Sequence, residues 1–399
     1  MMKFSITKEQ EMVAKTAMDF AVREVLPTIA ENDEKQYFDR SVLSKMADLG
    51  LLGICIPEQY GGSGLDYISL GLVCEELEAV DTSIRVIMSV HVGLNSMTML
   101  TWASEEQKEK YLVPQAKGER IATFGLTEPN AGSDVVGLQT TAVKDGDDYL
   151  LNGEKMWISL ADVADNFLVF AWTDQEKKRK RDHSGLSCFI VTREMGINTG
   201  TIHGKLGVRA GNTGWISLSD VRVPAKNMMG EEGEGFKIAM SALENGRYTV
   251  AAGATGLVRA CLEACLKYSK ERETFGRPIA QHQLVKEMLA EMVKDYDAAR
   301  LLYLRAGWMK NEGLRHTREV ALAKWYACDA SEKAAGNAVE IHGAYGYSNE
   351  YPVERYYRNC KGAVIYEGTR EIQKLMQADY ALGLRSDKPV RKTLPAWKG

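Results

Sequence analysis

A polar stretch near residue 130 contains residue types that could bind a ligand. It reads Phe124-Gly-Leu-Thr-Glu-Pro-Asn-Ala-Gly-Ser-Asp134. Pro129 and Gly132 favour a shaped loop with exposed backbone N–H groups, which could grip an anionic or carbonyl-rich ligand. A tight loop with a structural role fits the same residues equally well. No GxGxxG motif follows a predicted strand, so the sequence offers no Rossmann signature.

Cysteine and histidine, the usual metal ligands, are scattered. There are seven cysteines, an odd number without a CxxC pair, and the six histidines form no HExxH motif. Cys261 and Cys265 would share one face of a helix. They are either a metal pair or, as cysteine more often is, two small buried residues.

Three segments of different periodicity must position these residues. Residues 1–120 read as helices, beginning after a capping-box pattern at Ser5-Ile-Thr-Lys-Glu-Gln. Residues 121–232 alternate between apolar and polar positions and contain turn signals such as Asn152-Gly153, which predicts a small antiparallel sheet. Residues 233–399 return to long helices. This α+β order of helices, sheet and helices argues against a doubly wound parallel sheet.

Composition is that of an ordinary soluble protein. The 399 residues are 45% hydrophobic and 26% charged, with a net charge of −4 that favours neither nucleic acid nor an acidic membrane. The charged start MMKFSITKEQ does not resemble a signal peptide, and we expect no membrane span and a cytoplasmic location. The basic run 177–181 reads as a solvated loop, with targeting or nucleic-acid contact as the alternatives.

Several motifs occur in an order that resembles the acyl-CoA dehydrogenase family. The stretch 124–134 resembles its flavin- and substrate-binding signature, and Lys155-Met-Trp-Ile-Ser159 its strand beside the flavin. Further matches are Arg272-Glu-Thr-Phe-Gly-Arg-Pro-Ile-Ala-Gln-His-Gln283, Glu340-Ile-His-Gly-Ala-Tyr-Gly346 and Ile365-Tyr-Glu-Gly-Thr369. The resemblance covers nearly the whole chain. It implies a C-terminal four-helix bundle, FAD in a cleft between the domains, a homotetramer built as a dimer of dimers, and an electron-transfer flavoprotein as electron acceptor.

The resemblance implies that Glu367 is the catalytic base. The α-proton of a thioester is weakly acidic, so its removal needs a carboxylate in a dry pocket that raises the basicity. The N–H of Glu367 and a flavin ribityl hydroxyl would polarise the thioester carbonyl, and the β-hydrogen would leave as hydride to flavin N5. Without the resemblance, Glu367 reads as a solvated loop carboxylate.

By the same resemblance, a set of residues is expected to contact the flavin: Phe124, Leu126, Thr127, Ser133, Trp157, Ile158, Ser159, Arg272, Phe275, Gln283, Glu340, Gly343, Ala344, Thr369 and Glu371. Of these, Arg272, Phe275 and Gln283 would reach a neighbouring subunit's FAD. Trp157 could instead be a core residue. Glu340 stands where many members have glutamine, so a surface glutamate is its alternative.

The acyl-CoA is expected to contact Ser133, Arg247, Glu244 and Gly368, with Glu244 replacing the aspartate common in the family. Arg85 and Ser89 resemble the pair that binds the distal carboxylate in glutaryl-CoA dehydrogenases, and Glu78 matches a glutamate of those enzymes. A buried arginine is costly without an anionic partner, which favours a substrate with an acidic tail. A structural ion pair of Arg85 with Glu78 or Asp81 is the alternative.

Other features leave the substrate open. Thr369-Arg-Glu371 is nearer to ordinary short-chain enzymes, so butyryl-CoA and alicyclic acyl-CoA stay alternatives. Tyr366 and Glu78 match decarboxylating glutaryl enzymes, so decarboxylation is a further expectation to test. An acyl-CoA oxidase and a non-catalytic CoA-binding protein are rival classes; the presence of Glu367 argues against the second.

Overall fold

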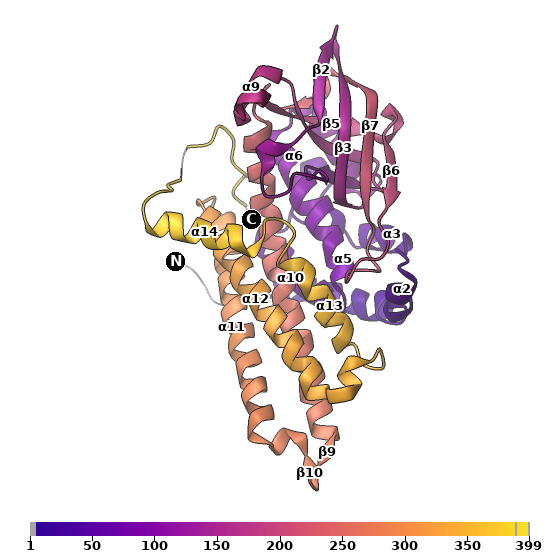
Figure 1. Cartoon of the computed structure of the whole chain (residues 1–399), viewed down its shortest axis with the longest axis vertical. Coiled ribbons are helices and arrows are strands. Elements are labelled where there is room, and N and C mark those ends of the chain that lie inside the picture. Colours follow the sequence, from indigo (N-terminus) through magenta and orange to yellow (C-terminus); the bar gives the residue numbers. More distant parts are fainter. Residues whose placement is uncertain (1–4, 388, 398–399) are drawn as a thin grey trace.

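The computed structural model describes residues 5–387 and 389–397, in which a β-sheet domain lies above two groups of helices (Figure 1). The predicted order of helices, sheet and helices is confirmed. The first group comprises α1 Lys8–Phe20, α2 Ile29–Lys35, α3 Ser41–Asp48, α4 Tyr67–Val80, α5 Thr82–Ile87, α6 Met97–Trp102, α7 Glu105–Gln107 and α8 Val113–Ala116. Between α5 and α6 the chain continues as a π-helical segment, Met88–Ser96.

The first helix starts where its sequence predicts. Thr7 and Gln10 form a capping box, in which each side chain accepts a hydrogen bond from the other's backbone N–H. This exchange satisfies N–H groups that have no partner inside the helix.

The sheet domain comprises β1 Ala122–Gly125, β2 Thr141–Asp145, β3 Asp148–Ser159, β4 Asn166–Trp172, β5 Leu186–Thr192, β6 Asn198–Thr201, β7 Thr213–Pro224 and β8 Met228–Met229. The strand order is β6-β7-β3-β2-β4-β5-β8, with β1 beside β4. Most neighbours are antiparallel, as predicted, but β1 pairs with β4 in parallel and β2 meets β4 in a single parallel pair. The parallel β1 is a departure that the sequence pattern did not signal.

The basic run differs from its predicted loop. It lies in a short helix, α9 Gln175–Lys180, whose first N–H groups are capped by the carboxylate of Asp174. The helix ends at Arg181 in a left-handed conformation, and its side chains are partly or fully exposed. Capping by Asp174 therefore stabilises a helix in a segment whose charge density had predicted a loop.

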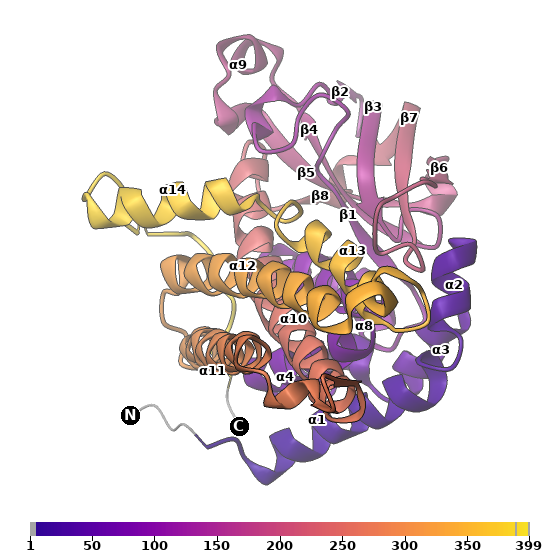
Figure 2. The same cartoon turned by 60° about the horizontal axis from the view of Figure 1, so that its bottom comes forward.

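The C-terminal helices are α10 Gly235–Glu271, α11 Gln283–Asn311, α12 Thr317–His342, α13 Val353–Ala363 and α14 Arg370–Ala381. Helices α10 to α13 lie together as a bundle (Figure 2). Helix α14 contacts α12 and lies across the end of the bundle nearer the sheet (Figure 1). A hairpin of β9 Glu273–Thr274 and β10 Arg277–Pro278 joins α10 to α11 at the end far from the sheet (Figure 1). The last residues return to the first helical group, where the indole N–H of Trp397 donates to the Gly64 carbonyl at 2.9 Å.

Helix α10 is the central element, because it packs against α4, α11, α12 and α13. It is long and apolar enough to span a membrane by composition, but 78% of its apolar window is buried inside the protein. Cys261 and Cys265 are buried within it, as predicted. At Gly256 the backbone of α4 comes so close that an added Cβ would lie 2.0 Å from the Glu75 carbonyl oxygen.

A glycine-to-alanine pair tests this close approach. Gly256→Ala should lower the free energy of unfolding by about 2 kcal/mol or more, because the backbone of α4 must shift. Gly336→Ala on α12 is the matched control, since its added Cβ would meet nothing closer than 3.9 Å. There alanine should be neutral or stabilising by up to about 1 kcal/mol through its better helix propensity. Urea unfolding of both variants measures the difference, and equal effects would contradict the assigned packing.

Candidate active site

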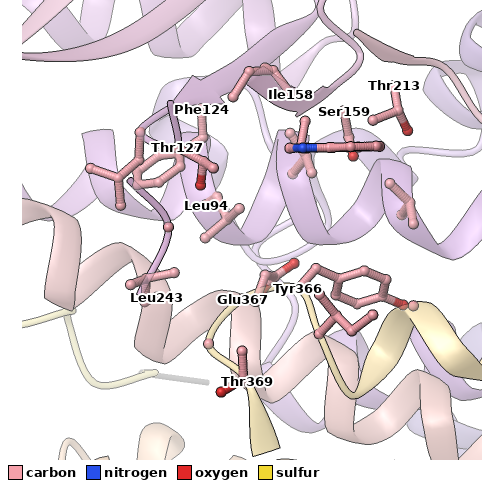
Figure 3. Close-up of a pocket in the computed structure, with 18 of the residues that line it drawn as sticks. Leu94, Phe124, Thr127, Ile158, Ser159, Thr213, Leu243, Tyr366, Glu367 and Thr369 are labelled. Atoms are coloured by element: carbon pink, nitrogen blue, oxygen red, sulfur yellow. The ribbon is translucent and has the colours of Figure 1, made fainter. Parts of the chain in front are cut away.

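A cavity of about 910 Å³ lies where the sheet domain meets the two groups of helices (Figure 3). Its walls come from the end of β1, the end of β3, the π-helical segment after α5, the first part of α10 and the segment between α13 and α14. Residues from all three sequence segments therefore meet in this one space.

The polar loop after β1 is held open by a buried ion pair. The Lys155 ammonium donates to Glu128 Oε1 at 2.8 Å and to the Phe170 carbonyl at 2.7 Å. Glu128 in turn accepts hydrogen bonds from the backbone N–H groups of Gln139 and Thr140. Because both charges are buried and paired, the loop has a fixed shape and presents Thr127 to the cavity.

A bulge in β3 turns Trp157 toward the cavity. The pairing of β3 with β7 shifts register between Met156 and Ile158, and Trp157 has φ +62°. A bulge redirects the side chain of its extra residue. The indole is accordingly 59% exposed and lines the cavity, which is not the buried core position that was the alternative for a lone tryptophan.

Glu367 stands opposite this wall, on the short segment before α14 (Figure 3). It has φ +55°, and its Oε2 is buried without a hydrogen-bond partner among the described residues. Gly246 on α10 leaves room for the carboxylate, since an added Cβ would lie 1.9 Å from Oε2. Burial raises the pKa of Glu367, against the opposing positive charges of Arg85, Lys324 and Arg247. Glu367 is therefore a carboxyl group with a raised pKa, and it lines a cavity in which a ligand could meet it.

Arg85 is fully buried and reaches the cavity wall. Its Nε donates to Glu78, its NH1 donates to Ser89 Oγ at 2.7 Å, and its NH2 donates to the Tyr366 hydroxyl at 2.5 Å. Burial by itself lowers the pKa of this guanidinium, but the Glu78 carboxylate and Tyr366 raise it above its usual value. The alternative of a pair with Asp81 is wrong, because Asp81 binds Arg355 at 3.0 Å instead.

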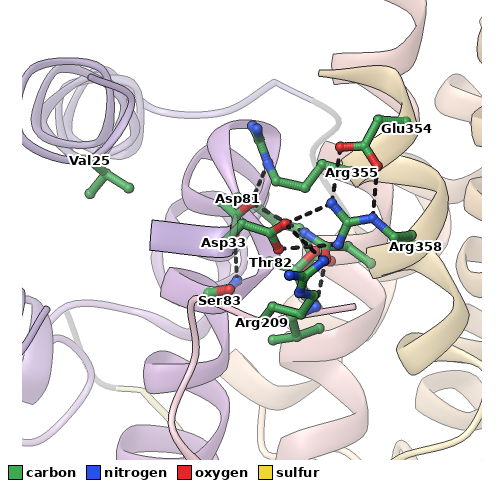
Figure 4. Close-up of polar contacts among 12 residues, drawn as sticks. Val25, Asp33, Asp81, Thr82, Ser83, Arg209, Glu354, Arg355 and Arg358 are labelled. Carbon is green, nitrogen blue, oxygen red and sulfur yellow. Dashed lines mark hydrogen bonds and ion pairs between the residues drawn. The ribbon is translucent and has the colours of Figure 1, made fainter. Parts of the chain in front are cut away.

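The loop before β7 forms a further wall and is anchored from two helices. Its Val208 N–H donates to Asn359 Oδ1 at 2.6 Å, and Arg358 donates to the Leu206 carbonyl at 3.3 Å. Arg358 also forms an ion pair with Asp33 on α2 at 2.7 Å (Figure 4). This junction of α2, α13 and the loop fixes one side of the cavity.

The structure brings many predicted site residues together. Those that line the cavity are Arg85, Phe124, Leu126, Thr127, Ser133, Trp157, Ile158, Ser159, Arg247, Glu367, Gly368 and Thr369. Three others lie beside it without lining it. Ser89 is buried behind Arg85, Glu244 accepts a hydrogen bond from Thr317 at 2.5 Å, and Glu371 is in the first turn of α14.

Six predicted residues lie elsewhere, near the hairpin that joins α10 to α11: Arg272, Phe275, Gln283, Glu340, Gly343 and Ala344. Phe275 is 97% exposed there, and the Arg272 guanidinium lies over the Tyr345 ring. The end of α12 and the hairpin thus form one surface, although their motifs are far apart in sequence. None of the six reaches the cavity of the same chain.

Sequence reasoning missed residues whose types carry no chemical signal. Val90, Leu94 and Leu243 form an apolar part of the cavity wall, and in the sequence they are ordinary helical hydrophobic residues. It also missed Lys324, a lysine that is 1% exposed on α12. A lysine among the apolar positions Val320, Ala323 and Ala327 was the signal that could have revealed it.

Comparisons with known proteins match nearly the whole length of the chain. Models of the acyl-CoA dehydrogenase N-terminal, middle and C-terminal domains match residues 7–119, 123–221 and 233–382. The short-chain specific acyl-CoA dehydrogenase of Clostridium acetobutylicum is 42% identical over 94% of this chain and 98% of its own. A chain solved in work on the electron transferring flavoprotein of Acidaminococcus fermentans is 42% identical, with a TM-score of 0.93 over 96% of this chain and 100% of its own. A glutaryl-coenzyme A dehydrogenase in complex with glutaryl-CoA is 38% identical, with a TM-score of 0.90 over 96% and 98%.

The raised pKa of Glu367 predicts how stability depends on pH. The folded state binds this proton more tightly than the unfolded state, whose carboxyl titrates near 4.5. The stability contributed by the protonated form is therefore complete below that value and is lost as the pH rises through the folded-state pKa. Glutamine does not ionise, so the stability of Glu367→Gln relative to wild type should increase as the pH rises from about 4.5 toward neutral.

Thermal unfolding across this pH range measures the effect. Glu371→Gln is the control, because the Glu371 side chain is 69% exposed and should show no such increase. A difference between Glu367→Gln and wild type that stays constant or shrinks with rising pH would contradict the raised pKa.

Proposed function

Because this chain belongs to the acyl-CoA dehydrogenase family, we propose that it oxidises the Cα–Cβ bond of a short acyl-CoA whose chain ends in a carboxylate, with glutaryl-CoA as the best candidate. The observation that carries the reaction is Glu367, which has a raised pKa in the cavity and whose Oε2 accepts no hydrogen bond from the part of the chain that the structure describes. The observation that carries the substrate tail is the charged Arg85 in the same wall.

The family is FAD-dependent, and the cavity residues fit this cofactor. Thr127 and Ser159 present hydroxyls on the wall across from Glu367 (Figure 3). The exposed Trp157 ring supplies an aromatic surface in the same cavity. These three residues, with Phe124 and Ile158, would hold the flavin ring. FAD, when bound, supplies the acceptor for the hydride that leaves the β carbon.

The chain's own residues account for the proton transfer. No described residue donates a hydrogen bond to Glu367 Oε2, so no such bond has to break before this oxygen accepts the α-proton. The raised pKa of Glu367 makes it a stronger base. No acceptor among residues 5–387 and 389–397 takes the backbone N–H of Glu367. That N–H would stabilise the oxygen of the thioester as negative charge develops.

The far end of the acyl chain is proposed to lie against Arg85. A guanidinium carries five N–H groups, and Arg85 uses three of them toward Glu78, Ser89 and Tyr366. No described residue accepts the remaining two, which would bind a carboxylate that enters past the apolar residues Val90 and Leu94. Tyr366 and Glu78, by resemblance, suggest loss of CO₂ after oxidation, which product mass would reveal as crotonyl-CoA in place of glutaconyl-CoA.

A neutral acyl chain is a second candidate, which the same contacts support. The Glu78 carboxylate already balances the charge of Arg85. The hydroxyls of Ser89 and Tyr366 accept hydrogen bonds from two further N–H groups of the guanidinium. A pocket that is neutral overall suits butyryl-CoA or an alicyclic acyl-CoA. The panel of substrates below separates these candidates.

Assembly and partners follow by proposal from the family. We propose domains over 1–120, 121–232 and 233–399, a homotetramer arranged as a dimer of dimers, and a cytoplasmic location. Phe275, Arg272 and Gln283 would then complete a flavin site in a neighbouring subunit, which is consistent with their exposed position far from the cavity. Electron-transfer flavoprotein is the proposed acceptor, since a similar chain was solved in work on such a protein.

Flavin reduction under anaerobic conditions tests the reaction. Glutaryl-CoA or butyryl-CoA should bleach the flavin of the wild type, and Glu367→Gln should slow this step about 10²–10⁴-fold while still binding FAD and acyl-CoA. Slow reoxidation in air would distinguish a dehydrogenase from an oxidase. Wild-type reduction rates in Glu367→Gln would remove Glu367 as the base, and a protein that takes up no FAD would overturn the proposed function.

A charge-balanced variant tests the substrate tail. Removing Arg85 alone would leave Glu78 as a buried unpaired charge, so Arg85→Met is combined with Glu78→Gln. If Arg85 binds the distal carboxylate, the ratio of kcat/KM for glutaryl-CoA to that for butyryl-CoA should fall about tenfold or more, as the loss of a charge-assisted hydrogen bond predicts. The measurement is dye-coupled turnover of both substrates.

The comparison has clear contrary outcomes. An unchanged ratio would show that Arg85 is a structural partner of Glu78. If the wild-type protein oxidises cyclohexanecarboxyl-CoA but not glutaryl-CoA, the proposed substrate would be an alicyclic acyl-CoA and not one that ends in a carboxylate.

A further inference from the structure

The backbone around Glu367 is held by three buried side chains, each from a different helix. The Lys324 ammonium, from α12, donates to the Tyr366 carbonyl at 2.6 Å and to the Gly368 carbonyl at 2.5 Å. Arg247, from α10, donates to the Glu367 carbonyl at 3.3 Å. Gln373, from α14, donates to the Gly368 carbonyl at 3.0 Å. Three consecutive carbonyl groups are therefore fixed from the protein interior.

The segment needs such support because its conformation is unfavourable by itself. Glu367 has φ +55° and Gly368 has φ +89°, so two successive residues lie in the left-handed region. A non-glycine residue adopts this region at a cost in free energy, and persists there when its surroundings impose it. Lys324 bridges the carbonyls on either side of Glu367 and so spans the strained residue.

The orientation of the Tyr366 carbonyl sets that of the Glu367 N–H. In a trans peptide the carbonyl and the N–H of the same unit point in opposite directions. Because Lys324 binds this carbonyl from the interior, the N–H is directed away from Lys324. No described residue accepts it, and Glu367 lines the cavity.

The surroundings of Lys324 indicate a role other than simple stabilisation. The side chain is buried, and none of the carboxylates in the described residues forms an ion pair with it. A buried ammonium bonded to carbonyl groups alone is costly to the fold. Burial accordingly lowers its pKa to about 8.

We propose that Lys324 is a positioning residue, which holds the Tyr366 and Gly368 carbonyls so that the N–H and the carboxylate of Glu367 both face the thioester. The inference rests on the proposed function and extends it to a residue that does not touch the substrate. Arg247 and Gln373 assist by fixing the next carbonyl groups.

Proton exchange isolates the step that Lys324 serves. 3-Thiabutyryl-CoA carries sulfur in place of the β carbon, so no β-hydride can leave and chemistry stops after α-proton removal. Wild-type protein in D₂O should replace the α-hydrogens of this compound by deuterium, measured by mass spectrometry. Lys324→Met should slow the exchange about 100-fold, the scale of one lost oxyanion donor, with FAD content and analogue affinity retained.

Lys310→Met is the matched control. Lys310 is also buried, its pKa is also lowered to about 8 by burial, and its ammonium binds Asn245 at 2.7 Å instead of the segment around Glu367. This variant should lose stability yet exchange within about threefold of wild type, because it leaves that segment untouched. Equal exchange rates in Lys324→Met and Lys310→Met would overturn the inference.

The pH profile of exchange separates positioning from a charge effect. If Lys324 acted through its charge alone, Lys324→Met would move the acid limb set by Glu367 to higher pH and recover the wild-type plateau. Positioning instead predicts a lower plateau, and full recovery at high pH would contradict it. Lys324→Arg, which keeps both charge and donors, should restore part of the rate.

A second variant tests the inference if Lys324→Met does not fold. Gln373→Leu removes an uncharged donor to the Gly368 carbonyl and should slow exchange about tenfold, as the loss of one hydrogen bond predicts. Wild-type exchange in Gln373→Leu would then overturn the inference. Absence of exchange in the wild type itself would overturn the proposed function and the inference together, whereas exchange in the wild type with no effect of the variants overturns the inference alone.

Discussion

Close packing against three glycines of α10 underlies the arrangement of the elements around this helix. Gly246 makes room for the Glu367 carboxylate, and Gly253, seven residues later on the same face, makes room for the Glu78–Arg85 pair. Gly256 lets the backbone of α4 lie against α10. A Cβ at any of these positions would come within about 2 Å of an atom of its neighbour. One helix thus sets the depth of the cavity, the place of the base and the packing of the N-terminal helices.

Several buried charged side chains form close ion pairs. Lys155 is paired with Glu128, Arg85 with Glu78, and Arg355 with Asp81. These pairs satisfy both charges, as buried ionic groups require. Glu367 and Lys324 differ, because neither has an ion-pair partner among the described residues. Burial shifts the pKa of each toward its neutral form. Glu367 lines the cavity and is therefore expected to act on a ligand, whereas Lys324 does not line it and is proposed to act through the backbone on either side of Glu367.

The cavity is lined by residues from all three segments of the chain. The wall with Thr127 and Trp157 comes from a sheet with a bulge, whereas the wall with Glu367 comes from a segment strained into a left-handed conformation. Such local departures from regular structure cost free energy and persist because packed elements on several sides impose them. The loop before β7, tied to α2 and α13 through Arg358, shows the same dependence on distant elements.

The order of helices and strands, the polar loop 124–134 and the motifs that resemble a known family could all be recognised before the chain was seen folded. Periodicity and capping are local properties, so the start of α1 and the strands of the middle segment could be predicted from nearby residues. Tertiary structure decided the rest. It placed Arg85 against Glu78 and away from Asp81, gave β1 a parallel neighbour, and made a helix of the basic run. It also set Lys324 behind Glu367, which lies 43 positions later in the chain. The apolar pattern around Lys324 can indicate that this lysine is buried, but its contact with the segment before α14 exists only after the helices pack.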